Sequence, residues 1–363
     1  MIPIKQIVLD WLMEEDNPPV RYLTIKHLLK LPDSHVLRVL GAKNNIMNYD
    51  PVNVILDNRS SFLPGSAQKY QPYKKYQGLY WQIIFLGDFL ADADDERARE
   101  CCEAVLKLQQ DTGEYKAVPP WRDKDGIVCL SGNVLRGLIT MDYAEHPNVK
   151  KGLDYIAQRI IRNNGVPCAV MDNSIYDTCY MTVPRTLRTF ASLPEHLRTD
   201  SIQKAMRILI EKEYSNHIYK YVISNARQYH DAYMAYTKNK GTKTTAEERK
   251  KFKQDFRSNN PGKPGQEKKG WKRFAFPLHY NTNLLEAVVS LIEAGDIRKG
   301  ELSEAVQIIL NKKQEDDRWL MDESLNGKMY VDIEQKGKPS KWITFYALFA
   351  LDSIEGVVFQ DKN

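Results

Sequence analysis

The stretch LYWQIIFLGDFL at residues 79–90 has the apolar content of a buried helix, and a second run with helical spacing follows at residues 96–108 after a short acidic turn. The pair ends in the turn Gln110 to Tyr115. The same arrangement returns further along the chain, at residues 131–141 with 149–161, 182–193 with 202–213, and 283–293 with 302–312, and a last half-unit covers 342–351. Successive first helices are roughly 50 residues apart, the spacing of a repeat of helix hairpins.

One such hairpin cannot bury its apolar faces alone, but stacked neighbours can. We therefore expect an all-α protein, a toroid barrel of helix hairpins over residues 70–363, with an open solenoid as the alternative. Residues 1–69 are expected to form a short helical extension that packs on the barrel. Its clearest signal is Asn17-Pro18, an N-cap residue followed by a proline at the first helical position.

Composition narrows the class of protein. The chain has 363 residues, of which 42% are apolar and 27% charged, as in soluble globular proteins. It has no apolar run of about 18 residues that could span a membrane. Its first residues lack the layout of a signal peptide, and its five cysteines form no paired framework. These features predict a cytoplasmic location.

The net charge of +5 belongs to one segment. Residues 238–273 hold thirteen Lys or Arg against four Asp or Glu, so the rest of the chain is acidic on balance. We expect a basic flexible insertion at about residues 237–270, with one surface helix from Ala246 to Phe256. A localised basic tract disfavours nucleic acid as a partner of the whole domain and leaves peripheral contact with anionic lipid headgroups open.

Several stretches resemble a known superfamily. Gln110 to Tyr115 and Gln314 to Trp319 are similar to the Gln-x-x-(Asp/Gly)-x-Trp-like turns that close helix hairpins in squalene-hopene cyclases. The stretches KYQGLYW (75–81), SGNVLR (131–136) and FPLHYNT (276–282) resemble segments of related α/α-toroid proteins, a superfamily of terpenoid cyclases that includes the β subunits of protein prenyltransferases. The resemblance covers roughly residues 70–352. It implies inner and outer helices around an apolar cavity that binds an isoprenoid or similar apolar small molecule.

The same resemblance implies a metal site. Asp177-Thr178-Cys179 matches the Asp-x-Cys spacing that supplies two zinc ligands in the prenyltransferase β subunits, and His279 stands at a later helix start, where the third ligand is found. Zinc favours these ligand types, and three ligands leave a fourth position open. The metal set is then Asp177, Cys179 and His279, with Asp177 and His279 also as the catalytic pair. The alternative is an N-cap aspartate, a small buried cysteine and a core histidine.

Aromatic residues gather near the expected inner-helix starts, where ring faces could stabilise a carbocation or simply fill a core. The expected substrate pocket consists of Tyr80, Trp81, Asn133, Tyr180, Tyr280, Asn281 and Trp342. A diphosphate would need a cationic cradle. Surface solvation is the expected role of the candidates for it, Arg185, Arg188, Lys272 and Arg273.

Asp92-Ala93-Asp94-Asp95 spells the Asp-x-Asp-Asp string of class II terpene cyclases, but it falls in a hairpin turn, where a solvated N-cap is expected. Two functions remain open. The first is a terpenoid cyclase or prenyltransferase-like protein that binds an isoprenoid in an aromatic-lined cavity. Zinc is the candidate cofactor of this protein. The second is a non-catalytic toroid that binds a ligand or partner with an eroded site. The sequence does not indicate an oligomeric state.

Overall fold

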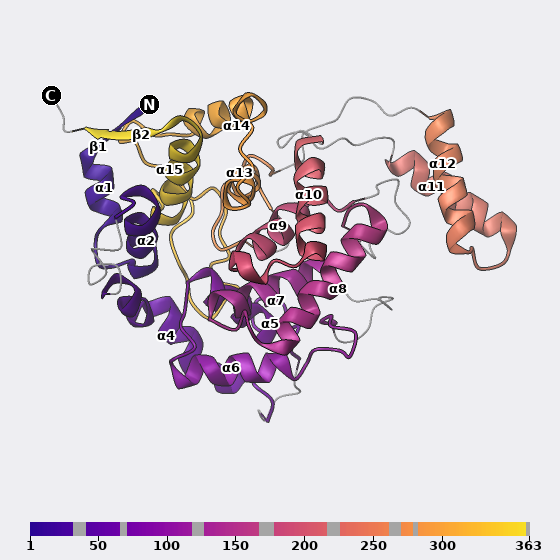
Figure 1. The fold of residues 1–363 in the computed structure, drawn as a ribbon, viewed down its shortest axis with the longest axis horizontal. Coiled ribbons are helices and arrows are strands. Elements are labelled where there is room, and N and C mark those ends of the chain that lie inside the picture. The colour runs from indigo at the N-terminus through magenta and orange to yellow at the C-terminus, as the bar shows by residue number, and fades with distance from the viewer. Residues whose placement is uncertain are drawn as a thin grey trace.

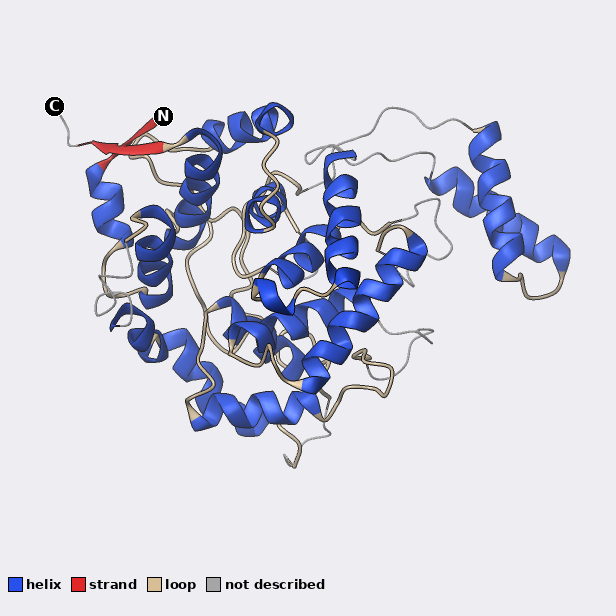
Figure 2. Ribbon diagram, in the orientation of Figure 1, coloured by secondary structure: helices blue, strands red, loops and turns tan. Residues whose placement is uncertain are grey.

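The computed structural model describes residues 1–31, 41–65, 71–117, 127–166, 178–215, 226–260, 270–278 and 282–360. The described chain is mostly helical, which confirms the all-α class (Figure 2). The expected helix pairs all form, with ends within a few residues of those expected. None of the helices within these ranges is long and apolar enough to cross a membrane.

One set of helices is buried on nearly every side: α5 (Leu79–Asp88), α7 (Val128–Thr140), α9 (Val183–Ala191), α13 (Leu284–Glu293) and α15 (Lys341–Glu355). Every residue of α5 is buried. Each of these inner helices contacts the next, in the order α5, α7, α9, α13, α15. In α5 the nearly continuous apolar sequence follows from this placement, because no face of that helix meets water.

A second set carries one apolar stripe each: α6 (Glu96–Leu106), α8 (Pro147–Asn163), α10 (Asp200–Ser215) and α14 (Lys299–Asn311). Each outer helix contacts inner helices, as α8 contacts α7 and α14 contacts α13 and α15. In α8 the buried positions Val149, Leu153, Ile156 and Ile160 recur at helical spacing. The outer helices lie around the inner ones in Figure 1.

The N-terminal region lies between the two ends of the inner series. It holds α1 (Gln6–Leu12), α2 (Pro18–Leu23), the π-helical turn η1 (Thr24–Leu28), the 3-10 turn η3 (Asn45–Asn48) and α4 (Asp50–Asp57). Asn17 caps α2 as expected, accepting a hydrogen bond from Val20 N at 3.3 Å. Contacts lead from α15 to α2, from α2 to η3, from η3 to α4 and from α4 back to α5.

The two ends of the chain form a parallel two-stranded sheet that the sequence did not reveal. β1 (Ile2–Lys5) pairs with β2 (Val357–Gln360), with Ile2 opposite Val357 (Figure 1). The first helix, α1, begins directly after this strand, at Gln6. Four-residue strands give little alternation, and pairing between ends more than 350 residues apart has no local signal.

The basic insertion is more ordered than expected. α11 (Ala226–Lys240) and α12 (Ala246–Asn259) form a hairpin that lies to one side in Figure 1. The helix expected from Ala246 is confirmed, and Thr245 begins it with a capping box to Glu248. Residues 237–240, expected in a loop, continue α11 instead. The hairpin buries its own aromatic cluster, which consists of Tyr229, Tyr233, Tyr236, Phe252 and Phe256.

Candidate functional site

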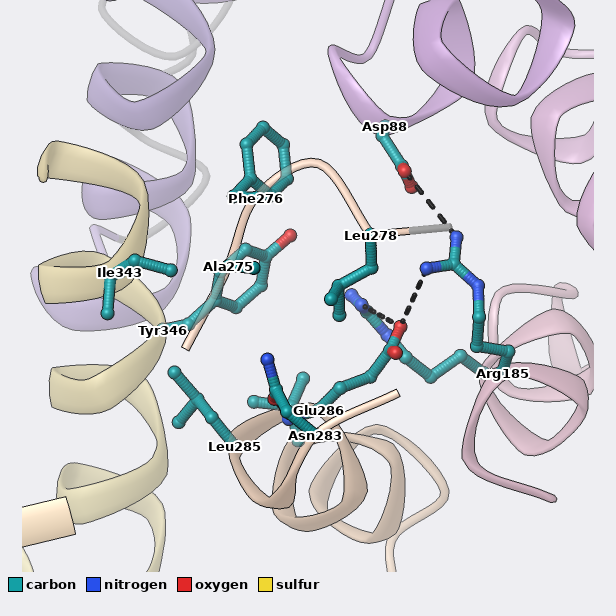
Figure 3. A pocket seen from close by; sticks show the side chains of 12 residues that line it. Asp88, Arg185, Ala275, Phe276, Leu278, Asn283, Leu285, Glu286, Ile343 and Tyr346 are labelled. Atoms are coloured by element: carbon teal, nitrogen blue, oxygen red, sulfur yellow. Dashed lines mark hydrogen bonds and ion pairs between the residues drawn. The ribbon is translucent and has the colours of Figure 1, made fainter. Parts of the chain in front are cut away.

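A pocket opens where α9, α13 and α15 meet the segment 275–278 (Figure 3). The space between its walls is about 370 Å³, a value that includes open solvent in front of the lining side chains. One side is charged and the other apolar. The lining residues are Asp88, Arg185, Arg188, Ala275, Phe276, Leu278, Asn283, Leu285, Glu286, Val289, Ile343 and Tyr346.

Arg185 stands at the centre of the charged side. It is the third residue of α9 and is only 3% exposed. Its Nε donates a hydrogen bond of 2.8 Å to Asn133 Oδ1 on α7. Among the described residues, the contacts of its two terminal nitrogens are long, 3.5 Å to Asp88 Oδ2 and 3.4 Å to Glu286 Oε1. Charge-assisted hydrogen bonds usually measure 2.7–2.9 Å, so the two terminal nitrogens of Arg185 make only weak hydrogen bonds to these carboxylates.

Arg188, one turn further along α9, is held much more firmly. Its Nε and Nη2 donate to the two carboxylate oxygens of Glu293 at 2.8 and 2.7 Å, a bidentate pair. Its Nη1 lies 3.3 Å from Glu286 Oε1. Burial would lower the pKa of Arg188, but the negative charges of Glu293 and Glu286 raise it well above its usual range. Arg188 therefore stays charged, and its pair with Glu293 ties α9 to α13.

Glu286 bridges the two arginines from the first turn of α13. It is 4% exposed, and the single oxygen Oε1 faces both guanidinium groups. The other oxygen, Oε2, accepts a hydrogen bond of 2.9 Å from Thr282 Oγ1. The helix start itself is fixed by Asn283, whose side chain accepts from Glu286 N at 3.0 Å. This places the Glu286 carboxylate at the pocket wall (Figure 3).

The charges of this network balance. Arg136 pairs with Asp88 beside Arg185, so three arginines meet the three carboxylates of Asp88, Glu286 and Glu293. Nearby Glu213 of α10 is also buried. Burial, followed by the negative charge of Glu286, raises the pKa of Glu213 to about 8. Its carboxyl group is consequently mostly neutral at pH 7.

Aromatic rings form the apolar side. Phe276 stacks on Trp342 with ring centroids 3.7 Å apart, and Tyr346 lies 6.1 Å from Phe276. The guanidinium carbon of Arg188 is 5.4 Å from the centroid of the Tyr346 ring, a cation–π contact between the two sides of the pocket. Trp342 itself is fully buried and does not line the pocket.

The expected zinc ligands are only partly described. Asp177 and His279 lie outside the described residues. Cys179 is 8% exposed, and its Sγ lies 3.2 Å from Thr182 Oγ1. Within the described part of the chain, no group of three His, Cys, Asp or Glu side chains could hold a metal ion. The zinc site stays a prediction.

The helices that follow these ligand segments do start together. Arg185 and Glu286 are each the third residue of their helix. Arg185 Nη1 lies 3.4 Å from Glu286 Oε1. The first turns of α9 and α13 are therefore neighbours. Residues 177–179 and 279–282 precede these two turns along the chain, and Asp177 and His279 themselves lie outside the described residues.

The residues expected to line the substrate pocket lie in different parts of the structure. Tyr80 and Trp81 are buried in α5, where the hydroxyl of Tyr80 donates to Lys116 O at 3.3 Å. Asn133 supports the pocket by accepting from Arg185, and its own Nδ2 is buried without a hydrogen-bond partner in the described structure. Tyr180 is half-buried, while Tyr280 and Asn281 lie outside the described residues.

The aspartate string forms the expected turn. Asp95 caps α6 by accepting from Arg97 N at 2.8 Å. Its hydrogen bond with the Arg97 side chain holds the pKa of Asp95 below its usual range. The string thus forms a turn that caps a helix, as expected.

The expectation of surface solvation was wrong for two arginines, and two acids were not predicted. Arg185 and Arg188, expected on the surface, are buried because they pair with carboxylates from α5 and α13. Arg273 is exposed as expected and pairs with Glu323. Asp88 and Glu286 were not singled out at all. Their only signal was a charged residue within a nearly continuous apolar helix.

Comparisons with known proteins leave the family open. No family model matches this sequence, and a search of curated proteins finds no match.

Proposed function

We propose that the protein is an α/α toroid whose central pocket binds an amphipathic ligand, of which an isoprenoid diphosphate is the representative class. The observation that carries this proposal is the presence of Arg185 and an aromatic wall in one pocket. The arginine suits an anionic head group, and the rings of Phe276 and Tyr346 suit an apolar chain.

The toroid itself is supported by the order of helix contacts. Inner helices contact one another from α5 to α15, and the contacts through α2, η3 and α4 lead back to α5. The outer helices add a second layer, as stacked hairpins would. A cytoplasmic location is part of the proposal and rests on the odd cysteine count of the sequence.

An enzymatic form of the proposal adds zinc. The neighbouring first turns of α9 and α13 support a site made of Asp177, Cys179 and His279. When bound there, zinc would deprotonate the Cys179 thiol or a substrate thiol and make it a better nucleophile. The ligand pocket does not depend on this metal, so binding and catalysis are separate questions.

A non-catalytic binding protein is the second candidate, and one observation favours it. The three arginines already face three carboxylates, so these described groups carry no excess positive charge. Such balance weakens the attraction for a highly charged substrate and suits a ligand that is bound but not turned over.

Calorimetric titration with farnesyl diphosphate, farnesol and inorganic pyrophosphate tests the proposal. We expect farnesyl diphosphate to bind more tightly than either part alone. Arg185→Gln should weaken its binding at least about tenfold, because a hydrogen bond to a charged group is worth about 1.5–3 kcal/mol. Arg273→Gln, which changes an exposed arginine that does not line the pocket, is the matched control. Equal affinities for the wild type and Arg185→Gln would refute the proposed head-group site.

A further inference from the structure

Glu286 holds an unusual position among the charged groups of the pocket. Its Oε1 faces Arg185 Nη1 at 3.4 Å and Arg188 Nη1 at 3.3 Å. Both distances exceed the usual length of a charge-assisted hydrogen bond, although all three side chains are buried. One oxygen shared between two guanidinium groups satisfies neither of them fully.

The two arginines differ in what else holds them. Arg188 has its bidentate pair with Glu293, which lies outside the pocket lining. Within the described part of the chain, Arg185 has Asn133 as its one partner at a normal hydrogen-bond distance. The two Nη1 groups therefore converge on one point of the pocket wall, and the Glu286 carboxylate lies at that point (Figure 3).

We propose that Glu286 is an internal competitor that stands where the anionic group of the ligand binds. A phosphate or diphosphate oxyanion then takes its place between Arg185 and Arg188 and brings oxygens within normal hydrogen-bond distance of both. A tetrahedral phosphoryl group offers several oxygens at that point, whereas Glu286 offers one. Thr282, which donates to Glu286 Oε2 at 2.9 Å, holds the carboxylate in the competing position.

This inference rests on the proposed pocket and deepens it, because it names the oxyanion class and the residue that sets its affinity. Glu286 acts as a specificity-determining residue. A ligand with a weakly charged group does not displace it. A ligand with two or more negative charges does, because its attraction for the two guanidinium groups exceeds that of one carboxylate.

Pyrophosphate binding to Glu286→Gln, measured by calorimetric titration at fixed salt, tests the inference. Glutamine keeps the size of the side chain and removes the competing charge. We expect the affinity for pyrophosphate to rise at least about tenfold over the wild type. Glu286→Asp keeps the charge but shortens its reach, and we expect an intermediate affinity. An affinity in Glu286→Gln equal to or below that of the wild type would overturn the inference.

Glu293→Gln separates displacement from a general gain in positive charge. It removes the same charge from the same Arg188, but Glu293 neither lines the pocket nor pairs with Arg185. We expect its gain in pyrophosphate affinity to stay within about threefold. A gain as large as that of Glu286→Gln would show that any lost carboxylate has this effect, and the inference would fail.

Thermal unfolding covers the case in which Glu286→Gln is unstable. Pyrophosphate should raise the Tm of Glu286→Gln by more than that of the wild type, since a ligand stabilises the state to which it binds. A smaller rise contradicts the inference. The prenyl chain is tested separately. If pyrophosphate binds as expected but farnesyl diphosphate binds no more tightly, the proposed ligand class is wrong and the role of Glu286 still holds.

Discussion

Gly137 of α7 lies directly against the backbone of Ile83 in α5. A Cβ atom built on Gly137 would stand 2.4 Å from the carbonyl oxygen of Ile83, and one built on Gly87 would stand 2.4 Å from Gly137 Cα. The two helices thus approach each other more closely than side chains allow. Asp88 directly follows Gly87 and Arg136 directly precedes Gly137, so this contact sets the position of both residues, which pair in the pocket network.

Gly137→Ala should destabilise the protein by about 1–3 kcal/mol, because the added methyl group forces two packed backbones apart. Urea unfolding followed by circular dichroism measures the change. Gly300→Ala is the control, since nothing lies within 4 Å of a Cβ at that position in α14. Alanine is the better helix former, so the control should be stabilised by up to about 1 kcal/mol. Equal effects of the two substitutions would contradict the close approach of α5 and α7.

Glu213→Gln should change how stability depends on pH. The folded protein raises the pKa of Glu213 to about 8 from 4.5, so the folded state binds this proton more tightly than the unfolded state. The wild type is therefore expected to lose stability as the pH rises from about 5 to about 8, relative to a variant that cannot ionise there.

Because the wild type loses stability as the pH rises, the difference in stability between the wild type and Glu213→Gln should grow with pH. Near pH 5 their free energies of unfolding should be similar, and at pH 8.5 Glu213→Gln should be the more stable by about 1–3 kcal/mol. Urea unfolding at several pH values gives the measurement. Glu211→Gln on the exposed side of the same helix serves as the control. A difference that does not grow with pH would show that Glu213 titrates normally.

Cys179→Ser tests the zinc site. If Asp177, Cys179 and His279 hold the metal, elemental mass spectrometry of the purified, untagged protein should find about one zinc per chain in the wild type and far less in the variant. Circular dichroism should show nearly unchanged helical content. Cys129→Ser, at another described cysteine, should retain the metal. Full retention of zinc in Cys179→Ser would remove this residue from the ligand set.

Local sequence patterns were enough to place the helices. Apolar spacing located the buried α5 and the amphipathic α8, and Asn17-Pro18 located the start of α2, because these signals act within a few residues of the chain. The turn at Asp92 to Asp95 was also predicted, since an acidic N-cap is a local feature. The all-α class follows from such elements together.

The charged site was decided only by the tertiary structure. Whether Arg185 lies on the surface or inside depends on Asp88, 97 residues before it, and Glu286, about a hundred residues after it. A charged residue in an apolar helix looks the same in the sequence whether or not a partner exists. Burial of Arg185 is tolerated only because helices from distant parts of the chain bring carboxylates to it. The pairing of β1 with β2 was likewise invisible, because backbone hydrogen bonds between the two ends of the chain leave no mark on either end alone.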